Sequence, residues 1–467
     1  MQKFPDCKSI CVICGTGNNG GDGYVVARLA LQANIKVTVL QLGNSESISN
    51  DALLARENYL KSGGVSFSFD TSLLDCDLIV DSIFGTGLDR KISGEYYDEI
   101  QAINKQVSSR QKTKVVAIDI PSGLAANTGA IFGICIVADL TVTFVGLKQG
   151  LFTGQARNYV GDIVFDSLSI PNRAYHQLEL PRSIKTIPDN ILQQLLVPRL
   201  KTSHKGHFGH VLLIGSDEGM TGAIRLAAEA ALRCGAGLVS VATHPSHATV
   251  LNLGRPEIMV NGIAHSDALK PLLEKATVIV IGPGLGNSDW SRSIFAEVIK
   301  TDLPAIIDAD ALNLLAEKNN GVGFKENWIL TPHPKEMARL LNVNTSDIEA
   351  DRFDSVLQKP IKSGGVSILK GAGTLIADSS KILVCTKGNP GMASGGMGDV
   401  LSGIIGALLG QGLSLFDAAT AGVQLHACAA DLAAKQGEKG LLASDLFPYL
   451  RALVNHNTDL KTFKNEL

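Results

Sequence analysis

Residues 9–30 read SICVICGTGNNGGDGYVVARLA and contain a complete strand–loop–helix unit. The apolar run SICVIC predicts a buried strand, and apolar residues return at helical spacing after residue 23. Between them, Gly15, Gly17 and Gly20 fit the GxGxxG pattern of a dinucleotide-binding loop. A strand that passes through a glycine loop into a helix is the repeating unit of a parallel α/β sheet. We therefore expect an α/β fold.

The same alternation continues through the first third of the chain. Apolar strand signals recur at residues 36–42, 78–84, 114–120 and 139–145. Helical periodicity appears between strand signals, at residues 23–34 and 50–64. This pattern predicts a Rossmann-like parallel sheet with helices on both faces.

Length and composition limit the class of protein. A chain of 467 residues is too long for one compact core, so two or three domains are expected. Aromatic residues make up 5% of the chain and there are 48 glycines, which favours α/β domains over β-sandwiches. The net charge of −3 argues against a nucleic-acid partner, and no apolar window reaches the length of a membrane helix. The N-terminal residues lack the zones of a signal peptide, so we expect a cytoplasmic protein.

Two clusters contain residue types that bind metals: Cys7, Cys11 and Cys14, and His204, His207 and His210. A cysteine zinc site would need a second ligand pair of matching spacing, and the sequence has none. Because residues 9–14 read as a strand, we interpret these cysteines as small core residues of a reduced protein. The histidine segment crosses Gly206 and Gly209 into a strand, so its side chains need not share a face, and we favour a non-metal interpretation.

The strand and helix signals stop near residue 171 and restart after residue 200. The intervening segment has four prolines and no sustained strand signal. A new series then follows, with a helix at 222–237 and strand signals at 209–216, 238–243, 277–284, 305–310, 328–332, 367–371, 373–378 and 381–386. We predict a first domain at residues 1–170, a connection at 171–200 and a larger α/β domain at 201–467.

Polar groups stand at the predicted strand ends of the first domain. They are the NNGGD stretch at residues 18–22, Asp81, Asp119 and Lys148. Since ligands of open parallel sheets bind at the carboxyl ends of the strands, we expect these groups to form one site. The NNGGD oxygens could hold a hard cation or orient a polar ligand; the alternative is a plain asparagine–glycine turn.

The glycine loop alone does not establish a dehydrogenase. Nicotinamide dehydrogenases carry an acidic residue at the end of the next strand, where it binds ribose hydroxyls. Here that strand is followed by Gln41 and Asn44, and the first acid is Glu46. The sequence therefore argues against an ordinary nicotinamide dehydrogenase.

The motifs NNGGDG, VDSIFGTGL, IDIPSGL and TFVGLKQGL occur in this order within residues 8–170, and this half resembles the NAD(P)H-hydrate epimerase family. The resemblance implies a binding site for the hydrated nucleotide. Its lining residues would be Asn18, Asn19, Gly20, Gly21, Asp22, Gly85, Thr86, Gly87, Leu88, Asp89, Arg90 and Lys91. It also implies K⁺ ligands at Asn19, Asp81 and Ser122, and acid–base chemistry at the substrate contact Asp119 with Lys148. Family members usually carry a helical segment before the first strand, and this chain begins almost on that strand. Without that helical segment, its packing or the dimer surface that it provides would be lost, and the epimerase activity would be weaker.

The second half contains its own glycine-rich segment, GNPGMASGGMGDVLSGIIGALLG, at residues 388–410. Apolar residues recur at helical spacing after Asp399, so a buried helix is expected to begin near that residue. The free N–H groups of a helix start form an anion site. Asp399 is then either an N-cap or first-turn acid of the helix, or a catalytic carboxylate beside that anion site.

Further loops of the second half favour the catalytic interpretation. They are GPGLG at 282–286, Asp308 with Asp310, His333 with Glu336 (alternatively a helix cap), and KGAGT at 370–374. Lys370 and backbone amides could bind phosphate, although the spacing is not that of a P-loop. Phosphoryl transfer needs such N–H groups and cations, and it needs a base for the acceptor hydroxyl. We therefore assign Asp399 as that base.

The motifs HKGHFGHVLLIG, MTGA, AALRCGAGLV, GPGLG, DADALN, TPHPKE, KGAGT and GNPGMASGGMGDVLSG follow one another over residues 201–445. This half resembles the ribokinase-like superfamily and, within it, the ADP/ATP-dependent NAD(P)H-hydrate dehydratases, which implies a ribokinase-like α/β sandwich. The resemblance implies hydrate contacts at Ala223, Gly286, His333 and Asp399. It implies adenine-nucleotide contacts at Lys370, Gly371, Ala372, Gly373, Thr374 and Gly398. Many relatives have threonine or serine where Met397 stands, and we expect little effect because backbone groups form the anion site.

The implied activity is nicotinamide-nucleotide repair. NADH and NADPH add water to give two epimeric hydrates, and the dehydratase restores the S form while ADP is converted to AMP and phosphate. The epimerase converts the R form to the S form. We expect ADP, with ATP possible, together with Mg²⁺ and K⁺, in a homo-oligomer without nucleic-acid or membrane partners. The alternative is a ribokinase-like small-molecule kinase whose first half is a non-catalytic binding module.

Overall fold

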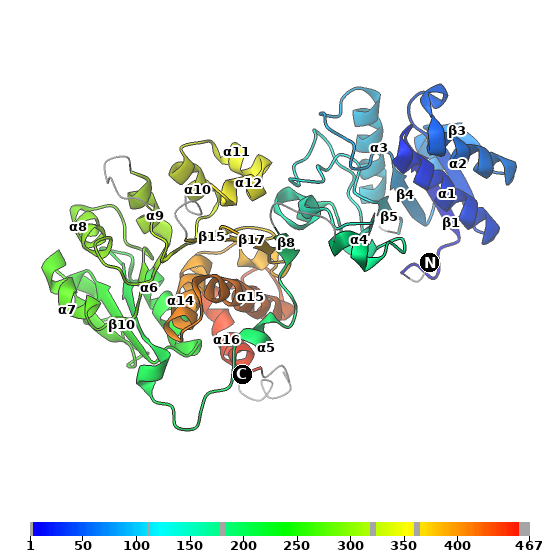
Figure 1. The fold of residues 1–467 in the computed structure, drawn as a ribbon. Coiled ribbons are helices and arrows are strands. Elements are labelled where there is room, and N and C mark those ends of the chain that lie inside the picture. The colour runs from blue at the N-terminus through cyan, green and yellow to red at the C-terminus, as the bar shows by residue number, and fades with distance from the viewer. Residues whose placement is uncertain (1–2, 110–111, 177–182, 318–323, 359–364, 457–467) are drawn as a thin grey trace. The chain divides into compact units, whose positions relative to one another are not determined.

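The computed structural model describes residues 3–109, 112–176, 183–317, 324–358 and 365–456. The chain forms two compact units, Met1–Leu180 and Pro181–Leu467, and each contains a sheet covered by helices (Figure 1). No helix within the described ranges is both long and apolar enough to span a lipid bilayer.

The first unit contains a seven-stranded sheet with the order β3-β2-β1-β4-β5-β6-β7. Its strands are β1 (Ser9–Cys14), β2 (Lys36–Gln41), β3 (Ser66–Ser68), β4 (Leu78–Ser82), β5 (Lys114–Ile118), β6 (Leu140–Phe144) and β7 (Asp162–Asp166). All neighbouring pairs are parallel, and the five predicted strands are confirmed. The chain order reverses between β1 and β4, and ligands of such open sheets bind beside this reversal, at the carboxyl ends of the strands.

Helices cover both faces of this sheet, as predicted. They are α1 (Asn18–Gln32), α2 (Asn50–Lys61), α3 (Glu95–Ser109) and the short α4 (Asn172–His176). Cys11 of β1 belongs to the apolar cluster that includes Ile100 of α3, whereas Cys14 belongs to the cluster that includes Tyr24 of α1. Both thiols are buried, which confirms their role as core residues, and Cys7 lies half-buried before the strand.

Helix α1 begins earlier than its apolar periodicity predicts, at Asn18 instead of near residue 23. The early start is possible because glycines let the helix approach the ends of β1 and β4. A Cβ on Gly20 would lie 2.0 Å from the Gly15 carbonyl oxygen, and one on Gly23 would lie 2.0 Å from Ser82 Oγ. The NNGGD stretch is therefore the first turn of a helix rather than a plain asparagine–glycine turn.

The second unit contains a ten-stranded sheet with the order β11-β10-β9-β12-β13-β14-β15-β16-β17-β8. Its strands are β8 (Ser183–Thr186), β9 (His210–Ile214), β10 (Leu238–Thr243), β11 (Met259–Gly262), β12 (Val278–Ile281), β13 (Ala305–Ile307), β14 (Trp328–Leu330), β15 (Val366–Leu369), β16 (Leu375–Ala377) and β17 (Lys381–Val384). The strands from β11 to β15 are parallel, and β16 is antiparallel to both of its neighbours.

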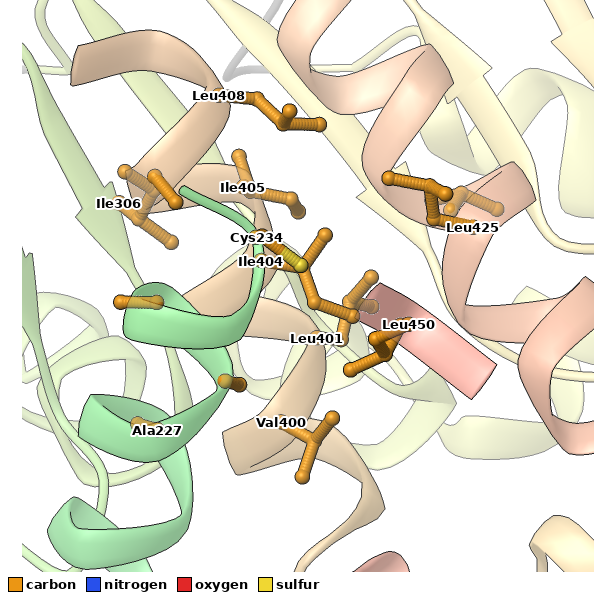
Figure 2. Close-up of a cluster of buried hydrophobic side chains, with 14 of the residues drawn as sticks. Ala227, Cys234, Ile306, Val400, Leu401, Ile404, Ile405, Leu408, Leu425 and Leu450 are labelled. Atoms are coloured by element: carbon orange, nitrogen blue, oxygen red, sulfur yellow. The ribbon is translucent and has the colours of Figure 1, made fainter. Parts of the chain in front are cut away.

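Helices pack on both faces of the second sheet. They are α5 (Ile191–Leu195), α6 (Thr221–Arg233), α7 (Lys270–Leu273), α8 (Asp289–Val298), α9 (Ala309–Ala316), α10 (Pro334–Leu341), α11 (Thr345–Ala350), α12 (Arg352–Val356), α14 (Met397–Gly410), α15 (Leu415–Ala433) and α16 (Phe447–Val454). Helices α6, α14, α15 and α16 share one core, and α8 and α9 belong to the core of the opposite face. Figure 2 shows the larger core, in which apolar side chains of α14 lie between Ala227 of α6 and Leu425 of α15. The buried helix predicted to start near Asp399 is confirmed as α14.

The segment 171–200, expected to be a connection, contains regular structure. Strand β8 pairs in parallel with β17 at the edge of the second sheet, and α5 follows it. Ile187, Leu192 and Leu196 are buried in the core of the second unit. A four-residue edge strand between prolines leaves too short an apolar run to give a sequence signal.

Two candidate active sites

The first candidate site surrounds Asp81, which is fully buried at the end of β4. Ser122 donates two hydrogen bonds to it, from Oγ at 2.6 Å and from its backbone N–H at 2.8 Å, and Ile83 N–H donates a third at 3.3 Å. Burial raises the pKa of Asp81 to about 6, against the effect of these hydrogen bonds. No lysine or arginine among the described residues forms an ion pair with Asp81, so its ionised form lacks a counter-charge.

The three side chains that the sequence assigns to K⁺ lie together. Asn19 Nδ2 donates to the Phe84 carbonyl at 3.0 Å, and Phe84 N–H donates to Ser122 Oγ at 2.9 Å, next to Asp81. Asn19, Asp81 and Ser122 are all buried. Each of the three side chains carries an oxygen, the ligand type that hard cations prefer. The oxygens of Asp81 and Ser122 also take part in the hydrogen bonds described above. The residues present therefore fit a cation at this position.

Asp119 and Lys148 form an ion pair at the ends of β5 and β6. Asp119 has a positive φ of 65°, which turns its side chain sharply off the strand. Thr143 Oγ1 and Phe144 N–H also donate to Asp119 Oδ1, at 3.2 and 3.1 Å, and Lys148 Nζ donates to the Phe144 carbonyl at 2.7 Å. Burial and then the negative charge of Asp119 raise the pKa of Asp22, so Asp22 faces the same region. The predicted pair is thus brought together beside the NNGGD turn.

The two stretches predicted to line the hydrated nucleotide meet at one point. A Cβ on Gly85 would lie 3.4 Å from Asn19 Cβ, so the loop after β4 touches the first turn of α1. The remaining residues of the loop are largely exposed: Thr86, Gly87, Leu88, Asp89, Arg90 and Lys91. Gln41, at the position where a dehydrogenase carries its ribose-binding acid, accepts a hydrogen bond from Tyr24 at 2.6 Å and donates to the Cys14 carbonyl at 3.1 Å.

The second candidate site is built around Lys370, in the turn between β15 and β16. Lys370 Nζ lies 2.9 Å from Asp308 Oδ1 and 3.8 Å from Glu336 Oε2. Ser402 of α14 donates to Asp308 Oδ2 at 2.7 Å. Burial opposes ionisation of Asp308, but the Lys370 ammonium keeps the pKa of that carboxyl below its ordinary value. Burial raises the pKa of Glu336 to about 7.

Asp399 lies in the first turn of α14, beside this charged group. The N-cap of α14 is Gly396, with φ of 89°, and no side chain caps the helix, so Asp399 is not an N-cap. Asp399 is an acid of the first turn, which the non-catalytic alternative also allows. Burial, followed by the charge of Asp308, raises the pKa of Asp399 to about 6. A Cβ on Gly398 would lie 3.4 Å from Lys370 Nζ, which places the lysine directly against the helix start. Met397 points into the apolar core.

The KGAGT turn is hydrogen-bonded to Arg352, a residue that the sequence did not single out. Arg352 is almost completely buried, and its guanidinium donates to the carbonyls of Lys370 at 3.0 Å and Leu369 at 3.2 Å. Thr374 Oγ1 closes the turn by donating to the Gly371 carbonyl at 2.9 Å, while Ala372 remains exposed and Gly373 is buried. Arg352 opens the short, mixed-polarity helix α12, and nothing in that sequence distinguishes it from a surface cation.

The predicted hydrate contacts lie on neighbouring loops. A Cβ on Gly284 would lie 3.2 Å from Ala223 Cβ, which joins the GPGLG turn to the first turn of α6. Gly286 N–H donates to Asp310 Oδ2 at 2.8 Å. His333 and Glu336 cap α10 reciprocally: His333 Nδ1 accepts from Glu336 N–H at 3.3 Å, and Glu336 Oε2 accepts from His333 N–H at 2.7 Å. His333 therefore both caps the helix and leaves its ring half-exposed beside Glu336.

The three histidines at the start of this unit have separate roles. The rings of His204 and His207 stack with their centroids 3.7 Å apart. The ring of His210 bonds to Ser240 Oγ at 2.7 Å and to the Lys275 carbonyl at 3.1 Å. Over the described ranges, no three His, Cys, Asp or Glu side chains are placed to share a metal ion.

Comparisons with known proteins cover both halves. Residues 211–451 match the NAD(P)H-hydrate dehydratase family, and residues 1–150 match the family of YjeF-related protein N-termini. The bifunctional NAD(P)H-hydrate repair enzyme Nnr of Coxiella burnetii is 46% identical over 97% of this chain and 92% of its own length. The enzyme of the same name from Escherichia coli is also 46% identical, over 97% of this chain and 86% of its own.

A solved structure supports the assignment of the second half. The ADP/ATP-dependent NAD(P)H-hydrate dehydratase from Bacillus subtilis, co-crystallised with ATP and Mg²⁺, aligns with 58% of this chain and 98% of its own, at 28% identity and a TM-score of 0.53. These relatives are repair enzymes rather than the small-molecule kinases considered as the alternative. The chain belongs to the family of bifunctional NAD(P)H-hydrate repair enzymes, with an epimerase domain followed by a dehydratase domain.

Proposed function

We propose that residues 201–467 dehydrate the S hydrate at the Lys370–Asp399 site, with ADP as the phosphoryl donor. The observation that carries this proposal is the convergence of Lys370, Gly398 and Asp399 at the open start of α14. The helix N-terminus and the ammonium stabilise the charge of the transferring phosphoryl group. The hydroxyl oxygen of the hydrate attacks the terminal phosphorus of ADP, and AMP leaves. Asp399 accepts the proton of that hydroxyl during the attack.

The phosphorylated hydroxyl is then a good leaving group. The ring nitrogen lone pair forms a C=N bond while the C–O bond breaks and phosphate departs with its electron pair. Loss of a proton from the adjacent ring carbon restores the dihydropyridine. The KGAGT turn, held by Arg352, binds the adenine nucleotide in this proposal, and Ala223, Gly286 and His333 bind the hydrate. Mg²⁺, when bound with the nucleotide, would neutralise its phosphate charge.

For residues 1–170 we propose that Asp119 and Lys148 carry out the acid–base steps of epimerisation. Inverting the hydroxyl-bearing carbon requires one of its bonds to break and re-form with proton transfer. The paired carboxylate and ammonium can accept and donate those protons. Asn18–Asp22 and residues 85–91 hold the substrate, and Asn19, Asp81 and Ser122 would hold K⁺, which would supply a positive charge beside buried Asp81.

One assay tests both halves. Purified protein receives a mixture of both NADH-hydrate epimers with ADP, Mg²⁺ and K⁺, and recovery of reduced-nicotinamide absorbance is followed. We expect complete recovery, faster with ADP than with ATP. Recovery that stops once the S form is consumed would remove the epimerase assignment, and no recovery with either nucleotide would remove the dehydratase assignment.

We further propose that the protein is a homo-oligomer, which light scattering on the purified protein tests. We also propose a cytoplasmic location, which cell fractionation tests.

A further inference from the structure

A cavity of about 1080 Å³ opens beside the proposed hydrate contact Gly286. It is bordered by α9, α10 and the start of α11, and its lining includes Met220, Gly286, Asp310, Asn313, Lys335 and Arg339. Its volume suits a ligand of dinucleotide size. None of the residues proposed for the adenine nucleotide lines it, so the cavity extends the hydrate side of the site.

Four charged side chains line the cavity, and the two acids already have partners. Asp310 accepts from Gly286 N–H at 2.8 Å and from Asn313 Nδ2 at 3.4 Å. Glu317 forms a two-bond ion pair with Arg292 at the rim. The two cations, Lys335 and Arg339, form no ion pair with any described residue. The cavity wall therefore presents the two cations of α10 together with one carboxylate, Asp310, whose hydrogen-bond partners are neutral N–H groups.

Lys335 and Arg339 stand on one face of α10, because residues four apart on a helix are neighbours. A hydrogen-bonded chain fixes Arg339 relative to Gly286. Arg339 Nη1 donates to Asn313 Oδ1 at 2.6 Å, Asn313 donates to Asp310, and Asp310 accepts from Gly286 N–H. The guanidinium uses one of its nitrogens in this chain. Its other N–H groups make no hydrogen bond with any residue that the structure describes, so they can form the paired hydrogen bonds that phosphate oxygens accept.

We propose that Arg339 and Lys335 bind a phosphate group of the hydrated dinucleotide while its ring lies at Gly286 and Asp399. This inference rests on the proposed dehydratase function and names the part of the substrate that the cavity selects. The phosphate belongs either to the pyrophosphate bridge, which both hydrates share, or to the 2′-phosphate, which only NADPH hydrate has.

The test compares Arg339→Gln, Lys335→Gln and the double variant with the unmodified protein on both S hydrates at saturating ADP. We expect KM to rise on the order of tenfold for each single variant while kcat changes little, because a binding contact remote from the ring is lost. An equal rise for both hydrates assigns the pyrophosphate, and a rise for NADPH hydrate alone assigns the 2′-phosphate. Arg339→Lys should restore part of the loss. Lys300→Gln, which removes an exposed cation from α8's end outside the cavity, is the matched control.

Unchanged KM values for both hydrates in the double variant would overturn the proposal and leave the dehydratase function standing. If the unmodified protein does not turn over either hydrate, the proposed function fails. The affinity for NADPH, measured by calorimetry in the unmodified protein and the double variant, then tests the phosphate site by itself. Binding weakened about tenfold or more in the double variant would support it, and equal binding would remove it. Both side chains are exposed, so their replacement should leave the melting temperature unchanged.

Discussion

Asp81 and Asp308 are both fully buried carboxylates at the ends of parallel strands, yet their charges are stabilised in different ways. Asp81 has only hydrogen bonds from Ser122 and Ile83, and its pKa rises to about 6. Asp308 has the Lys370 ammonium at 2.9 Å, and its pKa falls below the ordinary value. Equal burial thus gives opposite pKa shifts, because Asp308 has a lysine beside it and Asp81 has no cationic side chain beside it among the described residues.

The largest expected effect comes from Asp399, whose carboxylate forms no ion pair and no hydrogen bond with any residue that the structure describes. Asp399→Asn should lower dehydratase kcat by about 10²–10⁴-fold, because the base for the hydrate hydroxyl is lost. Epimerase activity and the melting temperature should be unchanged, since the amide has nearly the same shape. Normal dehydratase turnover by this variant would remove Asp399 from the role of base.

Removing the cation of the second site should make Asp308 resemble Asp81. Lys370→Met leaves a buried carboxylate unpaired, which should destabilise the second unit by about 3–5 kcal/mol and stop dehydration. The measurement is chemical unfolding followed with a probe confined to that unit. The double variant Lys370→Met/Asp308→Asn should recover part of the stability but none of the activity. If it is no more stable than the single variant, the ion pair is not the source of the loss.

Supplying a cation to the first site should make Asp81 resemble Asp308. The folded state holds the Asp81 proton more tightly than the unfolded chain, so this carboxyl favours folding below pH 4 and loses that contribution as the pH rises through about 6. Bound K⁺ should offset the loss at neutral pH. We expect K⁺ to raise the melting temperature of the first unit by a few degrees, on the order of 2–4 °C, at pH 7.5 but not at pH 5.

The control for this effect is choline chloride at the same ionic strength. Asp81→Asn should abolish the difference between the two salts at pH 7.5, whereas replacement of an exposed acid such as Asp98 should not. A potassium effect that persists in Asp81→Asn would place the cation elsewhere.

The smallest effect concerns the pH profile of the second site. In the proposed role of base, the Asp399 carboxyl must be ionised, and burial raises its pKa to about 6. Dehydratase kcat/KM should therefore fall about tenfold per pH unit below pH 6 and level off above it. Measurement at constant ionic strength from pH 5 to 8 tests this. A profile that is flat down to pH 5 would mean that Asp399 has an ordinary pKa or takes no proton.

The sequence predicts most of the fold, because buried parallel strands such as β1 and β12 give continuous apolar runs. It does not predict β3, β7, β8 and β11, which lie at sheet edges, where short strands with exposed side chains have no distinctive pattern. Within the sites, strand-end residues such as Asp81 and Asp119 could be found, since topology brings strand ends together. Arg352 could not, because its function depends on a tertiary contact with the KGAGT turn.

The close packing of α6 and α14 also determines how the second site is assembled. A Cβ on Gly403 would lie 2.0 Å from the Ala227 carbonyl oxygen, so the two backbones touch there. Ala223 and Asp399 stand one turn earlier on the same two helices. If Ala223 contacts the hydrate and Asp399 receives its proton, as proposed, the distance between these two groups is set by this helix contact. A single added methyl group at Gly403 would widen that gap without altering any residue that touches a ligand.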